Sequence, residues 1–315
     1  MSLVLVFPGQ GSQSVGMLAR LSERFPIVQR TFEEASTALG YDLWQLVSVG
    51  PTEQLNSTEC TQPAMLAAGV ATWRLWQDQG GAAPALVAGH SLGEFTALVC
   101  SEALDFSAAV TLVRERGRSM QAAVPAGDGA MAAILGLDDR SAEAACAEAA
   151  QGAVVEAVNY NAPGQIVIAG ETQAVERAIQ AAKARGAKRA VTLPVSVPAH
   201  SSLLRGAASQ LQERLKSVDL RVPRYAYMSA VDAATHADPA EIRTLLVRQL
   251  SSPVRWSATV LALTARGATL LAECGPGRVL TALNRRIDKR PEIHCVAIDD
   301  DASLQAAIMA ARSAQ

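Results

Sequence analysis

The chain has 315 residues, of which 50% are hydrophobic, 18% are charged and only 4% are aromatic. This composition excludes a disordered chain and predicts an aliphatic, alanine-rich core that needs neither disulfides nor a structural metal. Because the formal net charge is −2, no overall positive field draws the protein to nucleic acid or to an anionic membrane, and we expect neither as a partner.

The cysteines, the N-terminus and the histidines bear on compartment and metal binding. The five cysteines are odd in number and lack C-x-x-C spacing, which favours free thiols and predicts a cytoplasmic protein. The N-terminus has no basic segment typical of a signal peptide, and no apolar run approaches the roughly 18 residues of a membrane span. The four histidines show no metal-ligand spacing, so we expect no metal site.

Apolar runs that end at glycine or proline predict buried strands, and helical apolar periodicity predicts the helices between them. In the first 126 residues the predicted strands are 3–7 and 85–88. The predicted helices are 15–39, 63–77, 92–100 and a helix reaching 120. Pro63 suits a first helical turn, and Asp105 is placed to cap the last of these helices.

The pattern changes after Pro125, where strands and helices become shorter. The predicted strands are 131–137, 154–159, 165–169 and 189–197, and the predicted helices are 141–150 and 172–184. The order β-α-β-β-α-β over about 70 residues is typical of the ferredoxin-like fold. We therefore expect a small domain, residues 127–198, inserted into a larger one.

Alternation of helices and strands resumes after this insert. The predicted helices are 202–215, 239–250, 256–265, one after the turn at 275–277, and one at the C-terminus; the predicted strands are 225–229, 270–273 and 294–298. Alternation on both sides of the insert predicts one parallel sheet with helices on both faces. The expected fold is α/β, with a large domain formed by residues 1–126 and 199–315.

The segment Gly89-His-Ser-Leu-Gly93 matches G-x-S-x-G and lies between a predicted strand and a predicted helix, where that motif carries a nucleophile. Its glycines permit a sharp turn that projects the Ser91 hydroxyl. The amides that follow, beginning with that of Leu92, open a helix whose positive end can stabilise an oxyanion. The alternative is a tight turn with an ordinary serine. His200, where the chain re-enters the large domain, is the best placed candidate base, but spacing does not identify the residue that orients it.

Arg116 lies in the middle of the apolar stripe of its predicted helix, whereas Arg114 and Arg118 point elsewhere. An inward guanidinium without a partner is destabilising by several kcal/mol, so Arg116 requires a carboxylate. Either an internal Asp or Glu supplies it, or the arginine holds a substrate carboxylate in bidentate fashion.

The glycine-rich segment 9–16 does not fit a dinucleotide-binding loop, because its glycine spacing is wrong and Pro8 interrupts the turn. Gln10 is nevertheless a candidate for presenting a backbone amide to a reacting group.

Ten short segments along the chain, taken together and in this order, resemble a known family. They are Gly9-Gln-Gly-Ser-Gln13, Thr61-Gln-Pro63, Gly89-His-Ser-Leu-Gly-Glu94, Arg116-Gly117, Gly129-Ala-Met-Ala-Ala133, Asn159-Tyr-Asn161, Gly170, Pro198-Ala-His200, Pro253-Val254 and Gly275-Pro-Gly277. This combination, over nearly the whole chain, resembles the malonyl-CoA:acyl carrier protein transacylases of fatty acid synthesis. The resemblance implies a hydrolase-like α/β core with a ferredoxin-like insert and an active site in the cleft between them.

The resemblance also implies roles for individual residues. It makes Ser91 the acylated nucleophile and His200 its base, oriented by the backbone carbonyl of Gln249 rather than by an acid. It implies an oxyanion hole formed by the backbone amides of Gln10 and Leu92, and it pairs Arg116 with the malonyl carboxylate. The residues implied to line the pocket are Gln62, Met131, Asn161 and Val279.

The implied reaction moves a malonyl group from malonyl-CoA to the phosphopantetheine thiol of acyl carrier protein through malonyl-Ser91, without a cofactor. We expect a monomer. Three alternatives stay open: a malonyl transferase of a polyketide or malonate decarboxylase system, a serine hydrolase or thioesterase, and a non-catalytic carrier-binding protein. Two basic clusters are either docking sites for the acidic carrier or solvated helix ends: Lys183, Arg185, Lys188 and Arg189, and Arg285, Arg286, Lys289 and Arg290.

Overall fold

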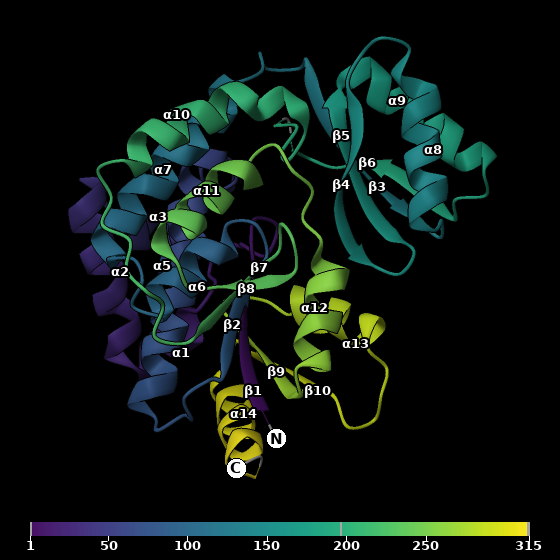
Figure 1. Ribbon diagram of the computed structural model, residues 1–315. Coiled ribbons are helices and arrows are strands. Elements are labelled where there is room, and N and C mark those ends of the chain that lie inside the picture. The colour runs from purple at the N-terminus through teal and green to yellow at the C-terminus, as the bar shows by residue number, and fades with distance from the viewer. Residues whose placement is uncertain (1, 196, 314–315) are drawn as a thin grey trace.

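The computed structural model describes residues 2–195 and 197–313, which form a six-stranded and a four-stranded sheet (Figure 1). The larger sheet has the order β10-β9-β1-β2-β7-β8. Its strands are β1 (Ser2–Phe7), β2 (Leu86–Gly89), β7 (Ala226–Ser229), β8 (Ala234–His236), β9 (Ala268–Cys274) and β10 (His294–Ile298). All neighbours pair in parallel except β7 and β8.

Strand β1 shows why this sheet is covered on both faces. Successive side chains of a strand point to opposite faces, and here both sets are apolar. Leu5 and Phe7 pack in one core cluster, whereas Val4 and Val6 pack in another with Trp256. The first cluster draws on α1 (Ala19–Arg24), α2 (Pro26–Leu39), α3 (Leu43–Val49), α4 (Thr52–Leu55), α5 (Thr58–Asp78), α6 (Gly93–Cys100), α7 (Phe106–Ala122), α10 (Arg205–Leu215), α11 (Pro239–Gln249) and α14 (Asp301–Ser313). The second cluster draws on α12 (Trp256–Ala265) and α13 (Val279–Ile287).

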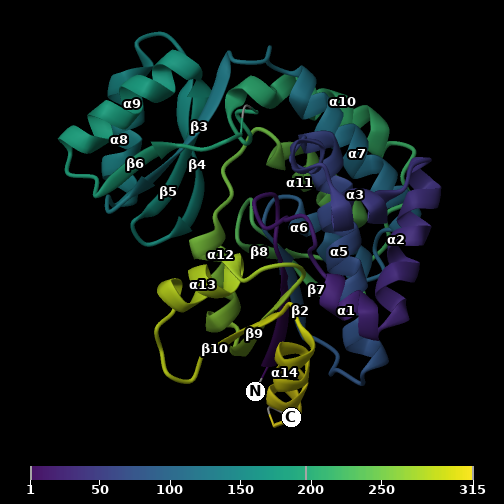
Figure 2. The ribbon, with the colours of Figure 1, turned by 180° about the vertical axis from the view of Figure 1, so that it is seen from behind.

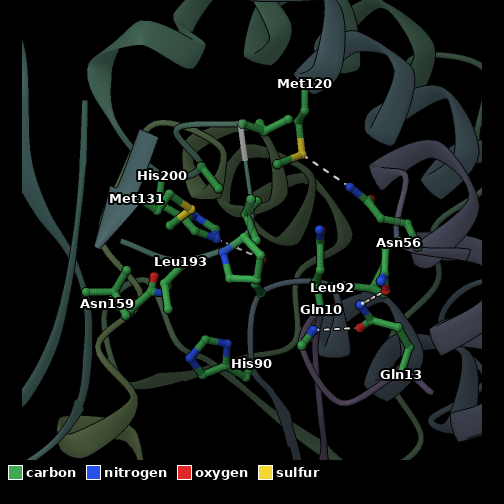
Figure 3. Close-up of a pocket in the computed structure, with 18 of the residues that line it drawn as sticks. Gln10, Gln13, Asn56, His90, Leu92, Met120, Met131, Asn159, Leu193 and His200 are labelled. Atoms are coloured by element: carbon green, nitrogen blue, oxygen red, sulfur yellow. Dashed lines mark hydrogen bonds between the residues drawn. The ribbon is translucent and has the colours of Figure 1, made fainter. Parts of the chain in front are cut away.

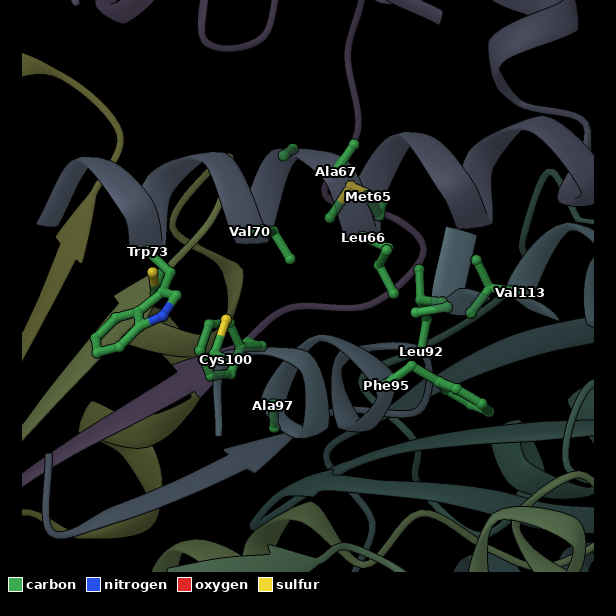
Figure 4. Packing of buried hydrophobic residues seen from close by; sticks show 14 of the residues in the cluster. Met65, Leu66, Ala67, Val70, Trp73, Leu92, Phe95, Ala97, Cys100 and Val113 are labelled. Atoms are coloured by element: carbon green, nitrogen blue, oxygen red, sulfur yellow. The ribbon is translucent and has the colours of Figure 1, made fainter. Parts of the chain in front are cut away.

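Helix α6, which follows the candidate nucleophile, is almost entirely enclosed. Figure 4 shows Leu66 and Val70 of α5 pointing toward α6, beside Phe95. Seven of the eight residues of α6 are buried. Packing on this scale fixes the position of the turn from which α6 starts.

The insert forms the four-stranded sheet, which Figure 2 shows beside the large unit. Its elements are β3 (Gly129–Leu135), α8 (Asp139–Ala150), β4 (Val155–Ala162), β5 (Gln165–Glu171), α9 (Thr172–Ala184) and β6 (Arg189–Thr192). The sheet order β4-β5-β3-β6, antiparallel throughout, is the ferredoxin-like order. The α/β class and the ferredoxin-like insert are thus confirmed, whereas the domain boundaries at 126/127 and 198/199 stay predictions.

The insert is joined to the large unit by main-chain hydrogen bonds. The amide of Tyr160 donates to the carbonyl of Val254, and the amide of Val254 donates to the carbonyl of Val158, each at 2.9 Å. Between them Asn159 and Val254 form a parallel bridge. One side of the cleft is therefore held by backbone as well as by side chains.

The prediction of a wholly parallel sheet is wrong at β8, which runs antiparallel to β7. The connection from Ser229 to Ala234 is a tight turn, closed by a 2.9 Å hydrogen bond from the amide of Ala233 to the carbonyl of Ser229. A turn of this length permits only an antiparallel return, because parallel neighbours need a crossover. His236, expected in a polar loop, lies in this edge strand.

Three further predictions of elements differ from the structure. The predicted helix 15–39 is divided into α1 and α2 at extended Phe25, and α2 starts at Pro26. Helix α5 begins at Thr58, not at Pro63, because buried residues ahead of the proline extend it by packing. The predicted strand 189–197 ends at Thr192, before Pro194, which has no N–H to donate to a ladder; Ser196 of that prediction lies outside the described residues. Helices α3, α4 and strand β8 were not predicted.

Within residues 2–195 and 197–313, no helix combines the length and apolar character needed to cross a membrane. The same residues contain no cluster of three or more His, Cys, Asp and Glu side chains arranged to hold a metal ion. All five cysteines are free and buried.

His236 is expected to make the stability of the fold depend on pH. Burial lowers its pKa, but hydrogen bonds and charges from Glu241 and Asp232, at 3.1 Å each, outweigh burial and raise it above 6.5. A raised folded-state pKa adds stability that is complete below about pH 6.5 and is lost as pH rises through the raised value. The unfolding free energy of the native chain should exceed that of His236→Gln by roughly 0.5–1 kcal/mol at pH 6 and by less at pH 9. A difference independent of pH, in urea titrations, would contradict this assignment.

Candidate active site

Ser91 lies on a sharp turn between β2 and α6 and has a left-handed backbone, with φ of 52°. Few residues other than glycine adopt this conformation without strain. The glycines on either side are required by packing. A Cβ on Gly89 would lie 1.9 Å from the carbonyl carbon of Gly93, and one on Gly93 would lie 2.0 Å from the carbonyl oxygen of Phe7. The turn therefore holds the Ser91 hydroxyl out from the sheet, as the motif predicts.

His200 lies just after the insert in the sequence, and its side chain contacts the Ser91 hydroxyl. Its Nε2 is 2.8 Å from Ser91 Oγ, and its Nδ1 is 2.7 Å from the main-chain oxygen of Gln249. A carbonyl only accepts, so Nδ1 carries the proton and Nε2 is free to accept the one on Ser91. Burial, and then the charge of Arg116, lower the pKa of His200 to about 3, which keeps the free imidazole neutral. Like Ser91, His200 has positive φ, at 67°.

Arg116 of α7 is 2% exposed and points at the same hydroxyl. Its guanidinium donates to Gln62 Oε1 at 2.9 Å, to Gln249 Oε1 at 2.8 Å and to Ser91 Oγ at 3.3 Å. No Asp or Glu among the described residues forms an ion pair with it, and its Nε has no hydrogen-bond partner. Burial lowers the pKa of Arg116 to about 10. Of the two alternatives for its partner, the direct internal ion pair is therefore wrong.

A cavity of about 440 Å³ lies over the three residues (Figure 3). Side chains of Met120, Met131 and Leu193 give it an apolar wall, and Figure 3 shows them around the same space as His200. The cavity is also lined by Gln10 and Leu92. In the described part of the chain, neither of their backbone amides donates to a protein acceptor, so both are available to an oxyanion.

Two of the four residues expected to line the pocket do so, namely Gln62 and Met131. Asn161 is not among the lining residues; its Oδ1 is bonded at 2.9 Å to Nε2 of His90, which does line the cavity. Val279 is not among them either: it starts α13 and is 45% exposed, outside the cavity. A role for Asn161 and Val279 in binding the substrate stays a prediction.

His90 and Asn159 also line the cavity, although neither had a predicted role. His90 packs against Trp256 and is bonded to Asn161, and burial lowers its pKa. Asn159 has a buried Oδ1 with no hydrogen-bond partner among the described residues. Alternation gave no usable signal for Asn159, because irregularities between Ala157 and Asn159 and between Tyr160 and Ala162 interrupt the period of two along β4.

Each of the two basic clusters has one arginine in an ion pair with an acidic residue. In the second, Arg290 pairs with Asp288 at 2.6 Å and Arg286 is bonded to Gln165. In the first, Arg185 pairs with Glu148, whereas the exposed Lys183, Lys188 and Arg189 have no ion-pair partner in the described part of the chain. A role for either cluster in docking stays a prediction.

Comparison with known proteins agrees with this geometry. The family model of the acyl transferase domain matches residues 4–298. By fold and by site, the chain is thus an acyl transferase.

Similar proteins identify the family of acyl transferases to which the chain belongs. The chain is 54% identical to the malonyl CoA-acyl carrier protein transacylase of Salmonella typhimurium, covering 96% of this chain and 97% of that one. It is 56% identical to the transacylase of the same name from Escherichia coli, over 90% and 91% of the two chains. A solved complex of a malonyl-transacylase with a type II polyketide acyl carrier protein superposes with a TM-score of 0.96 at 52% identity, covering 98% of this chain and 100% of that one. The chain belongs to the family of malonyl CoA-acyl carrier protein transacylases.

Proposed function

We propose that this protein transfers the malonyl group of malonyl-CoA to the phosphopantetheine thiol of acyl carrier protein, through an ester on Ser91. Arg116 binds the free carboxylate of the malonyl group, which turns the thioester carbonyl toward Ser91 Oγ, 3.3 Å from the guanidinium. The acyl group is then held by its carboxylate and presents its carbonyl carbon to Ser91 Oγ. The attack therefore takes place between two groups that are already in position.

In the first half-reaction His200 Nε2 takes the Ser91 proton as Oγ attacks the thioester carbon. The negative charge that develops on the carbonyl oxygen is stabilised by the amides of Gln10 and Leu92, and one such donor contributes about 10²–10³ in rate. The oxyanion then collapses, the carbon–sulfur bond breaks, and coenzyme A leaves as a thiol with the proton held by His200. The product is malonyl-Ser91.

In the second half-reaction the carrier thiol gives its proton to His200 and attacks the ester by the same path. Ser91 recovers its proton as it leaves. The ester must not be hydrolysed before the carrier protein arrives. The apolar wall of methionine and leucine side chains around the cavity supports this, because it limits the access of water. We propose that no cofactor takes part beyond the two substrates. The five free, buried cysteines support a cytoplasmic location.

The observation that carries this proposal is a buried arginine beside the nucleophile, to which no carboxylate of residues 2–195 and 197–313 is bound. The test is intact mass after incubation with malonyl-CoA and, separately, with acetyl-CoA. We expect a stoichiometric adduct of one malonyl group, stable until carrier protein is added, and little acetyl adduct. Rapid release of free malonate without an acceptor would instead favour a hydrolase, and absence of any adduct would favour a non-catalytic carrier-binding protein.

A second candidate is the same reaction serving a polyketide system. It is favoured by the similarity to the malonyl-transacylase solved with a type II polyketide carrier. The chemistry at Ser91 is identical in both cases, so the two are separated by comparing transfer rates to the two kinds of carrier.

A further inference from the structure

Glu94 is a buried carboxyl group beside the site that the reaction above does not use. It lies in the first turn of α6, three residues after Ser91, and is 0% exposed. It accepts hydrogen bonds from the hydroxyl of Tyr227, from Ser229 Oγ at 3.0 Å and from the amide of Ala230 at 3.2 Å. An acidic residue within an otherwise apolar helix requires this many partners to be tolerated.

These partners indicate that Glu94 is ionised. The amide of Ala230 can only donate, and Ser229 Oγ already accepts from the amide of Val231, so the hydrogen of Ser229 is directed at Glu94. Burial raises the pKa of Glu94 above its usual value, and the hydrogen bonds to the carboxylate reduce that shift. Burial and the neighbouring carboxylate also raise the pKa of Tyr227, which keeps its hydroxyl a donor.

Gln249 connects this carboxylate to the reacting groups. Its side-chain amide nitrogen donates to the main-chain oxygen of Ser91 at 3.0 Å, and the same side chain lies near enough to Glu94 to lower the pKa of that carboxyl. Its side-chain oxygen accepts from Arg116, and its main-chain oxygen accepts from His200. One glutamine therefore lies between a buried anion, a buried cation and the base.

The charges on the two sides of Gln249 interact. Glu94 raises the pKa of Arg116, against the larger effect of burial. No ion pair joins them. Glu94 therefore offsets the positive charge of Arg116 from a distance and leaves the guanidinium without a bound carboxylate. A substrate carboxylate that binds Arg116 meets a cation already attracted by Glu94.

We propose that Glu94 is a positioning residue, whose fixed negative charge balances Arg116 in the free enzyme and holds Gln249 so that guanidinium and base are in place before the acyl carboxylate arrives. This inference rests on the proposed role of Arg116. Because Glu94 competes electrostatically with the substrate for the same cation, removing its charge strengthens the binding of malonyl-CoA. The same removal leaves His200 facing an uncompensated cation, which makes it a weaker base.

The test is Glu94→Gln, which keeps the shape of the side chain and removes its charge. The first half-reaction is followed as release of coenzyme A, with malonyl-CoA and with acetyl-CoA. We expect KM for malonyl-CoA and kcat to fall together, each by about fivefold, while KM for acetyl-CoA does not change. A fall in kcat with both KM values unchanged or raised, as a structural role predicts, would overturn the proposal, and so would wild-type kinetics.

Two further variants separate charge from packing. Glu94→Asp keeps the charge but withdraws it from Gln249, so kcat should fall while KM for malonyl-CoA stays at the native value. Tyr227→Phe removes one donor and leaves the charge, and it should not lower KM for malonyl-CoA. A lowered KM in either variant would refute the inference even if Glu94→Gln does not fold. Loss of the malonyl adduct in the native protein would instead refute the proposed function.

Discussion

Replacing Ser91 with alanine is expected to abolish the malonyl adduct and to lower transfer to acyl carrier protein by about 10⁴-fold or more. The loss is this large because Ser91 Oγ lies 2.8 Å from His200 Nε2 and 3.3 Å from the guanidinium of Arg116, and no other hydroxyl of the described residues is hydrogen-bonded to that nitrogen. Binding of malonyl-CoA should survive, because Arg116 is untouched. Intact mass and carrier-transfer assays measure both outcomes.

Ser119→Ala is the matched control, since Ser119 lies in a surface groove between α7 and α10, away from the cavity. It should show native labelling and transfer. Retention of a malonyl adduct by Ser91→Ala, located on another residue by peptide mapping, would end the assignment of Ser91 as nucleophile.

Replacing Arg116 with alanine is expected to change which acyl group is transferred. Transfer of malonyl should fall by about 10²-fold or more, because a charge-assisted pair to the substrate carboxylate is lost in a buried site. Transfer of acetyl should be kept or should rise, because the cation that lowers the pKa of His200 is gone and the base becomes stronger. The measurement is kcat/KM for the two CoA esters.

Arg118→Ala provides the comparison on the same helix. Arg118 is exposed and pairs with Glu59 and Glu115, each at 3.2 Å, so its loss should leave the ratio of malonyl to acetyl transfer unchanged. Equal losses of malonyl and acetyl transfer in Arg116→Ala would show that this arginine supports the fold rather than selects the substrate.

Much of the α/β framework could be predicted from the sequence because strands such as β1, β2 and β9 are short apolar runs that end at or next to a glycine or a proline. Helices α9 and α12 and strand β10 have the predicted bounds. Asp105 caps α7 through a 2.9 Å hydrogen bond from the amide of Ala108, as expected. Strand β8 was missed because it is three residues long and is held by pairing with β7, and a pairing leaves no periodic trace in so short a segment.

The residues of the candidate site that act through their side chains could be predicted from the sequence. Ser91 has a motif, and Arg116 violates the polarity of its helix face. The proposed roles of Gln10 and Gln249 use backbone groups, which any residue possesses. Only the resemblance to a family indicated Gln249, whereas the glycines around Gln10 had already made it a candidate. Glu94 did leave a signal, an acid in an apolar helix, but its partners come from β7 and follow only from the folded chain.

The backbone bridge between Asn159 and Val254 limits how such enzymes can be recombined. Val254 follows Gln249 by five residues, so the loop that seats the insert is the one whose carbonyl aligns His200. His200 itself is where the chain leaves the insert. Grafting an insert from another acyl transferase would disturb the alignment of the imidazole as well as the shape of the cleft. Chimeras in this family should therefore exchange the segment around 249–255 together with the insert.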